Sequence, residues 1–323
     1  MANQRVLVTS WIVPEDDPSL EVLRAAGIEI VMARRQAAHT EDEMVELLKG
    51  ISGVVAGSDR YSEKVFASTR ELKVISRVGV GYDAIDVKAA TEHGVAITTT
   101  PGTNQDAVAD HALALILAVA RRIVDFDRFM RAGDWNRPTP ADVYRQTLGI
   151  LGLGRIGKGV ARRGRGFDMR VIAYDPFWDD EFARANQVER VGLDDVFRQA
   201  DFISLHLPSS AETLRIVNAE RLALMKPTAY LINTARGTLI DEDALYDALV
   251  SNRIAGAGLD VTSEEPLPAS SELWDAPNLF LSPHCSGRSK QTTALATGIF
   301  RDNLARYLAG QPLTNLVDMK AGF

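Results

Sequence analysis

The fold of this chain is decided by the stretch TLGILGLGRIG, residues 147–157. An apolar run of strand length ends there in three glycines spaced Gly-x-Gly-x-x-Gly, and a helical pattern follows. In that context Gly152 permits a tight turn, Gly154 lets backbone approach a ligand closely, and Gly157 lets helix and strand pack together. The stretch therefore predicts the first turn of a βαβ unit, whose helix N-terminus can meet an anionic group.

Further apolar, β-branched runs follow this stretch at the spacing of alternating strands and helices. They lie at 171–174, 202–205, 230–233, 256–259 and 279–282. With the run at 147–151 they make six strands joined by helical connections, which is the pattern of a doubly wound parallel sheet. We expect a Rossmann-like, cofactor-binding domain over residues 101–287.

The same rhythm occupies the N-terminal third of the chain. Strand-like runs lie at 5–9, 28–32, 53–56, 73–76 and 95–98, and the turn-forming residues 99–102 end the series. The last helical pattern, roughly 291–309, is expected to return to this first sheet. We therefore predict an α/β protein of two doubly wound parallel-sheet domains. The second of them is flavodoxin-like, discontinuous and substrate-binding, and it consists of residues 1–100 and 288–323.

Composition favours a globular protein that acts on small molecules. The chain has 323 residues, a length greater than one hydrophobic core usually organises. Its residues are 46% apolar and 24% charged, as in globular proteins. The net charge of −7 and the lack of any Lys/Arg block argue against nucleic acid or an anionic membrane surface as partner. The longest apolar stretch, 112–120, is shorter than the roughly 20 residues that a bilayer requires. We expect a cytoplasmic protein without a signal peptide.

The stretch 112–120 is apolar on every face of a helix. Such a helix must be buried on all sides. Packing within the chain is one explanation, and a two-fold interface between copies is the other. We expect a homodimer.

Asp175 lies 175 − 157 = 18 residues past the last glycine of the turn, at the end of the next strand. A carboxylate there can accept hydrogen bonds from a ribose diol and would repel a 2′-phosphate. The alternative is a turn aspartate before Pro176. We interpret Asp175 as the residue that selects NAD over NADP.

Three segments at the ends of late strands carry groups capable of chemistry, and the carboxyl ends of strands are where doubly wound sheets bind ligands. Taken singly, each group has an ordinary explanation as a surface cation, a solvated loop acid or a loop histidine. The groups are Arg236 in 233–237, Glu265 in 258–268 and His284 in 282–287.

Together with residues 77–81 (Arg-Val-Gly-Val-Gly) and 310–313, these segments resemble the D-isomer-specific 2-hydroxyacid dehydrogenases over nearly the whole chain. The loop at Arg77 and the segment 152–157 look closest to phosphoglycerate dehydrogenase-like members, although the C-terminal regulatory domains of many of those are not expected here. Glyoxylate, hydroxypyruvate and phosphite-oxidising relatives share the same frame.

The resemblance implies an enzyme that moves a hydride between nicotinamide and C2 of a small D-2-hydroxy or 2-oxo acid. It implies that the planar guanidinium of Arg236 holds the substrate carboxylate. His284 would take or supply the hydroxyl proton, since imidazole titrates nearest neutrality. Glu265 would hold the ring of His284 and favour its charged form.

The resemblance also implies where NAD and substrate bind. Asp260 would hold the carboxamide side of nicotinamide. Backbone N–H groups around Val78 and Gly79 would receive the substrate carboxylate, and Arg77 is either a further charge for an anionic substrate or a surface arginine. No metal ligand is expected. The full cofactor set consists of Gly152, Gly154, Arg155, Ile156, Gly157, Asp175, His206, Leu207, Pro208, Thr234, Ala235 and Asp260.

Several positions depart from the commoner family pattern: Asp110, Ala84 and the tripeptide 285–287 (Cys-Ser-Gly). None of them is a catalytic position, but the tripeptide leaves the identity of the acid open. We interpret Cys285 as a small packing residue, because hydride transfer needs no thiol nucleophile. Two other functions stay open: an NAD-binding sensor like the C-terminal binding protein corepressors, and a phosphite-type dehydrogenase on the same fold.

Overall fold

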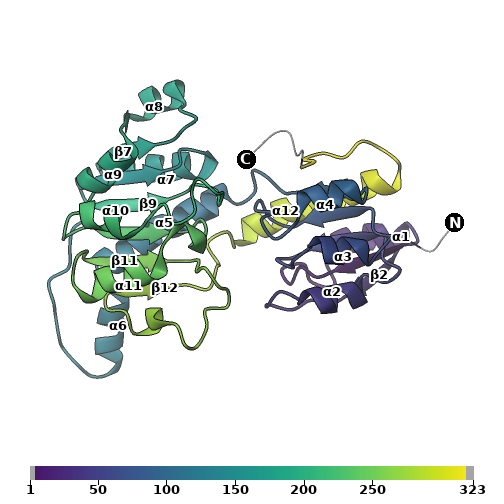
Figure 1. Cartoon of the computed structure of the whole chain (residues 1–323), viewed down its shortest axis with the longest axis horizontal. Helices are drawn as coiled ribbons and strands as arrows, with labels where there is room; N and C mark the ends of the chain where they lie inside the picture. The colour runs from purple at the N-terminus through teal and green to yellow at the C-terminus, as the bar shows by residue number, and fades with distance from the viewer. Residues whose placement is uncertain (1–3, 318–323) are drawn as a thin grey trace. The chain divides into compact units, whose positions relative to one another are not determined.

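The computed structural model describes residues 4–317. The chain divides into two compact units, unit 1 with Met1–Asn104 and Arg288–Phe323 and unit 2 with Gln105–Gly287. Each unit is built on one all-parallel sheet with helical connections (Figure 1), so the predicted fold class is confirmed. Within residues 4–317, no helix combines the length and the apolar character needed to span a membrane.

The sheet of unit 1 has the strand order β2-β1-β3-β4-β5, which is the flavodoxin-like order. Its strands are short and largely apolar, as expected for a parallel sheet covered on both faces. They are β1 (Arg5–Val8), β2 (Glu29–Met32), β3 (Gly53–Ala56), β4 (Val74–Arg77) and β5 (Ala96–Thr98). Their helices are α1 (Pro18–Ala25), α2 (Glu41–Leu47), α3 (Glu63–Ala67) and α4 (Val87–Glu92).

One further helix of unit 1 comes from the far end of the chain. Helix α12 (Lys290–Leu308), yellow in Figure 1, packs against β4 and α1. Its buried Phe300 and Leu304 share a core with Val6 of β1 and Val74 of β4. Because α12 buries its apolar face in this core, unit 1 consists of two separate segments of the chain.

The sheet of unit 2 has the order β12-β11-β10-β9-β6-β7-β8. Seven strands are present rather than the six expected, because the sequence prediction missed β8. That strand is only Val188–Arg190, and two of its three residues are charged and exposed, so it carries no apolar run. The strands are β6 (Thr147–Leu151), β7 (Arg170–Tyr174), β8 (Val188–Arg190), β9 (Phe202–Leu205), β10 (Tyr230–Asn233), β11 (Gly256–Leu259) and β12 (Leu279–Leu281).

The strand order of unit 2 reverses at β6, which lies between β9 and β7. Ligands of such sheets bind outside the carboxyl ends of the strands at this switch point. The helices around the sheet are α5 (Gln105–Ala120), α6 (Ile123–Arg131), α7 (Arg155–Gly166), α8 (Asp180–Asn186), α9 (Leu193–Gln199), α10 (Ala219–Leu224) and α11 (Glu242–Val250), with 3₁₀ turns η1 (Gly237–Leu239) and η2 (Glu272–Asp275).

The apolar stretch 112–120 lies in α5, and the residues that follow it form a second helix, α6. Arg122, with a left-handed φ of 53°, separates the two helices. Helix α5 packs against α7, β10 and β11, and Leu115 and Ile116 are fully buried there. Packing within unit 2 therefore accounts for the buried faces of α5, whereas α6 has no buried residue.

Candidate active site

The glycine turn between β6 and α7 is fixed by close backbone approaches. Gly152 has a φ of 97°, and a Cβ atom there would lie 2.7 Å from the carbonyl of His206. A Cβ atom at Gly157 would lie 2.0 Å from the oxygen of Gly152. Gly154 is the N-cap of α7, and a Cβ atom there would meet nothing within 4 Å. The turn is thus crowded at its two ends and open at Gly154.

Asp175 follows β7 and lies beside this turn. Its Oδ2 accepts the N–H of Leu153 at 2.5 Å, and its Oδ1 accepts the N–H of Phe177 at 2.6 Å. A carboxylate oxygen can accept more than one hydrogen bond. The half-buried Asp175 can therefore hold the glycine turn and still accept bonds from a ligand hydroxyl.

Two polar atoms at the same edge of the sheet are buried without a hydrogen-bond partner among residues 4–317. They are Nδ1 of His206, which follows β9, and Oγ1 of Thr234, which follows β10. Buried polar atoms are nearly always paired, so these two fit a site that a polar ligand such as NAD completes. Burial also lowers the pKa of His206 to about 3, so its ring is neutral near pH 7.

The other predicted cofactor residues lie around the same edge. Arg155 and Ile156 begin α7, and Leu207 and Pro208 follow β9. Ala235 follows β10, and its N–H is donated to Oδ1 of Asn233 at 2.9 Å.

Glu265 and His284 form a pair across the loops that follow β11 and β12. Nδ1 of His284 lies 2.6 Å from Oε2 of Glu265. The carboxylate is only an acceptor, so Nδ1 is the donor and Nε2 is left to exchange a proton with a ligand. Both side chains are reachable from solvent, with exposed fractions of 51% for His284 and 39% for Glu265.

Arg236 lies in the loop after β10. Its guanidinium donates to the carbonyl of Ala235 at 2.7 Å, and its own carbonyl accepts the side-chain amide of Asn233 at 2.8 Å. A Cβ atom at the next residue, Gly237, would lie 2.0 Å from the carbonyl carbon of Thr262. The Arg236 loop is therefore pressed against the segment that leads to Glu265.

Asp260 holds the loop that carries His284. Its carboxylate, fully buried, accepts the N–H of Cys285 at 3.0 Å and the N–H of Ser286 at 2.8 Å. Its carbonyl accepts the N–H of His284 at 2.8 Å. His284 has a φ of 46°, which is uncommon for a residue other than glycine, and these bonds hold it there.

His111 of α5 also belongs to this site, and the sequence analysis did not include it. Its Nε2 lies 3.0 Å from Oγ of Ser282, which in turn donates to Oδ1 of Asp260 at 2.6 Å. The available signal was a histidine directly before the apolar stretch 112–120. We interpreted that stretch only in terms of packing.

The predicted substrate residues Arg77, Val78 and Gly79 lie in unit 1 at the end of β4. The N–H of Val78 is donated to the carbonyl of Ala56 at 3.1 Å, and the N–H of Gly79 to Oγ1 of Thr100 at 2.9 Å. Arg77 donates to the carbonyl of Val78. Both N–H groups thus have acceptors, and a carboxylate at Gly79 would have to displace the Thr100 hydroxyl.

Comparison with known proteins agrees with the fold. The family described as "D-isomer specific 2-hydroxyacid dehydrogenase, NAD binding domain" matches residues 113–286. A glyoxylate reductase of Korarchaeum cryptofilum is 39% identical over 90% of each chain. A D-3-phosphoglycerate dehydrogenase of Synechocystis is 36% identical over 98% of this chain and 56% of its own length. The crystal structure of a glyoxylate reductase from Paecilomyes thermophila has a TM-score of 0.85 at 30% identity, covering 98% of this chain and 99% of that one.

The doubly wound sheet with its glycine turn and the match to an NAD-binding dehydrogenase family together define an NAD-binding oxidoreductase. The chain belongs to the D-isomer-specific 2-hydroxyacid dehydrogenase family. It is therefore an NAD-dependent enzyme that catalyses hydride transfer to or from hydroxy and oxo acids, as the resemblance implied.

Proposed function

We propose that the enzyme interconverts a small D-2-hydroxy acid and its 2-oxo acid, with glyoxylate or hydroxypyruvate as the preferred oxo acid. The observation that carries this proposal is the pair of His284 and Glu265, whose Nδ1 and Oε2 atoms are 2.6 Å apart. Relatives named glyoxylate reductase support the choice of a small acid.

His284 is proposed as the acid–base residue. With Nδ1 held by Glu265, its Nε2 supplies a proton to the oxo oxygen during reduction and takes the hydroxyl proton during oxidation. NAD, when bound, supplies the nicotinamide ring that accepts or releases the hydride. Glu265 fixes the orientation of the ring through the contact with Nδ1.

Arg236 is proposed to bind the substrate carboxylate. A guanidinium presents two parallel N–H donors to a carboxylate, which a lysine cannot do. We also propose Arg77 and the loop at Val78 and Gly79 as substrate residues, which makes unit 1 the substrate-binding unit.

The NAD site is proposed at the carboxyl edge of the unit 2 sheet. Gly154 offers the open backbone for the pyrophosphate, Asp175 the acceptor for the ribose diol, and Thr234 and His206 the two buried polar atoms. Asp260 is proposed to meet the carboxamide. The surrounding residues Arg155, Ile156, Leu207, Pro208 and Ala235 complete the lining.

A homodimer is proposed as well. The exposed apolar side chains of α6 support it, since Ile123, Val124 and Met130 are 54%, 49% and 57% exposed. Exposed apolar patches on stable proteins commonly mark interfaces. Residence in the cytoplasm stays a prediction from the sequence.

The test of the activity is NADH absorbance with four substrates: glyoxylate, hydroxypyruvate and 3-phosphohydroxypyruvate with NADH, and phosphite with NAD. We expect turnover with the two small oxo acids. Turnover with phosphite alone would replace the proposed substrate class, and inactivity across a wider panel of acids would favour the sensor.

The test of the residues compares His284→Ala with His93→Ala. His93 is a matched control, because it also pairs with a glutamate, Glu63, at 3.0 Å. His284→Ala should lower turnover by about 10² to 10⁴ and leave NADH binding nearly intact, whereas His93→Ala should change neither. Normal turnover in His284→Ala would refute the assignment.

A further inference from the structure

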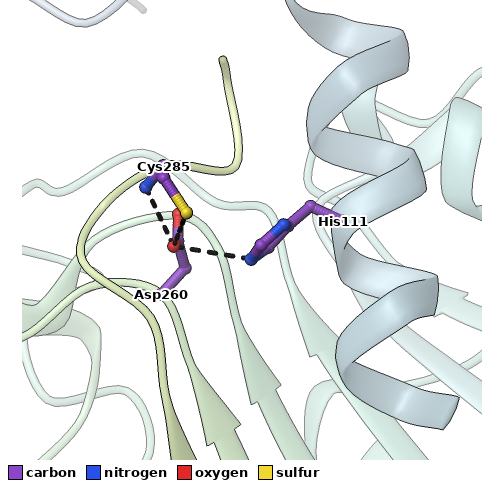
Figure 2. A group of neighbouring side chains, drawn as sticks. All are labelled: His111, Asp260 and Cys285. Atoms are coloured by element: carbon purple, nitrogen blue, oxygen red, sulfur yellow. Dashed lines mark hydrogen bonds and ion pairs between the residues drawn. The ribbon is translucent and has the colours of Figure 1, made fainter. Parts of the chain in front are cut away.

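Three side chains of different chemistry converge beside the proposed nicotinamide position. His111 comes from α5, Asp260 from the end of β11 and Cys285 from the loop after β12, and all three point toward one another in Figure 2. Oδ1 of Asp260 lies 3.5 Å from Nε2 of His111 and 3.6 Å from Sγ of Cys285. All three atoms lie within 4.8 Å of one another.

This donor set suits one class of cation. Imidazole nitrogen, thiolate sulfur and carboxylate oxygen are the ligands of zinc, and a thiolate disfavours magnesium and calcium. Around tetrahedral zinc, with bonds of about 2.0–2.3 Å, ligand atoms stand roughly 3.3–3.8 Å apart. Both distances to Asp260 already lie in that range.

We propose that His111, Asp260 and Cys285 form a binding site for a soft divalent cation such as Zn²⁺. Binding takes the thiol proton of Cys285, which is released to solvent. It also replaces the contact of His111 Nε2 with the Ser282 hydroxyl and the hydrogen bond from that hydroxyl to Oδ1 of Asp260, while the N–H of Ser286 still holds Oδ2. The neutral ring of His111 then carries its proton on Nδ1, which leaves Nε2 for the cation. Water takes the fourth position, as in open zinc sites.

The site has a consequence for the cofactor, and this step rests on the proposed role of Asp260. Its side chain has no exposed surface, whereas His111 is 25% exposed and Cys285 is half-buried. A cofactor can reach the Asp260 carboxylate only when a neighbouring side chain moves. A cation that ties His111 and Cys285 to Asp260 prevents this movement, so Zn²⁺ should compete with NADH.

The site itself is tested without cofactor, by adding Co²⁺ to the metal-free protein. We expect one equivalent to give the near-ultraviolet charge-transfer band of a cobalt–thiolate bond. Cys285→Ser should abolish this band and His111→Asn should weaken binding at least tenfold, while the surface control His93→Asn keeps it. Circular dichroism checks that each variant is folded. A missing band in the wild type, or a band retained in Cys285→Ser, would overturn the site.

The competition is tested by NADH fluorescence titration with and without Zn²⁺. At a Zn²⁺ concentration ten times its dissociation constant, the apparent dissociation constant of NADH should rise about tenfold in the wild type. It should stay unchanged in Cys285→Ser. A cobalt band without this shift would overturn the competition. Weak NADH binding in the metal-free protein would instead count against the proposed cofactor site.

Discussion

The carboxylate of Asp175 accepts the backbone N–H of Leu153 at 2.5 Å. The residue proposed to bind the ribose therefore also fixes the glycine turn that would bind the pyrophosphate. Recognition of the cofactor and rigidity of its loop depend on one side chain, so a substitution there has two separable effects.

Asp175→Ala should change both cofactor preference and stability. The loss of the carboxylate removes the ribose acceptor and the repulsion of a 2′-phosphate, so the NAD to NADP preference should fall by about tenfold or more, or 1.4 kcal/mol. The N–H groups of Leu153 and Phe177 lose their acceptor, which should cost about 1–3 kcal/mol of unfolding free energy. Kinetics with both cofactors and urea unfolding measure the two effects. The exposed Asp180→Ala is the control, and an unchanged preference in Asp175→Ala would refute the ribose contact.

Three alanine substitutions in one turn and helix should separate folding from cofactor binding. Gly157→Ala places a Cβ atom 2.0 Å from the Gly152 oxygen and should destabilise the protein by about 1–3 kcal/mol or more. Gly154→Ala meets nothing within 4 Å, so it should fold normally but bind NADH about tenfold or more weakly. Gly166→Ala, at the other end of α7, also meets nothing within 4 Å and should change neither the stability of the protein nor its affinity for NADH.

Thermal unfolding and NADH titration of the three glycine variants provide the measurement. Full NADH affinity in Gly154→Ala would show that the pyrophosphate does not approach the turn there. A stable Gly157→Ala protein would show that the turn can open.

His206 should make stability depend on pH. Burial lowers its pKa from 6.5 to about 3 on folding. The stabilisation is fully present above pH 6.5 and is lost as the pH falls toward 3, because only the unfolded chain takes up a proton in that range. As the pH falls from 6 to 4, the free energy of unfolding of the wild type should therefore decrease by up to about 1.4 kcal/mol per pH unit more than that of His206→Asn. Urea unfolding of both proteins across this pH range tests the prediction. Equal slopes of unfolding free energy against pH would contradict it.

Charged residues on α6 should separate the proposed dimer. Ile123→Glu with Met130→Glu places two charges on exposed apolar positions, so the chain should stay folded while its mass in light scattering halves. Val22→Glu, on an exposed position of α1 in unit 1, is the control. A wild-type protein that is monomeric at micromolar concentration would remove the dimer. Substitution of the buried Leu115 would not serve, because it would unfold unit 2.

Sequence patterns predicted most strands because buried parallel strands are continuous apolar runs. The pattern failed at β8, where Glu189 and Arg190 are exposed at the sheet edge. Glu189 forms an ion pair with Arg170 there. The break between α5 and α6 at the left-handed Arg122 is likewise not signalled by the apolar periodicity.

Site residues that belong to a sequence motif could be predicted, whereas residues that only the folded structure brings together could not. Glu265 and His284 were paired in the prediction, and the structure gives them a contact. His111 lies far from Asp260 in the sequence, and only the packing of α5 against β11 brings the two together. No spacing rule connects them.

The two separate segments of unit 1 also have a consequence for synthesis on the ribosome. Unit 2 is one continuous segment, 105–287, and is complete before α12 emerges. Until then, Val6 and Val74 lack the Phe300 and Leu304 side chains that share their core. The N-terminal segment of unit 1, residues 1–104, therefore keeps apolar surface uncovered on the ribosome while unit 2, which follows it in the chain, can already fold.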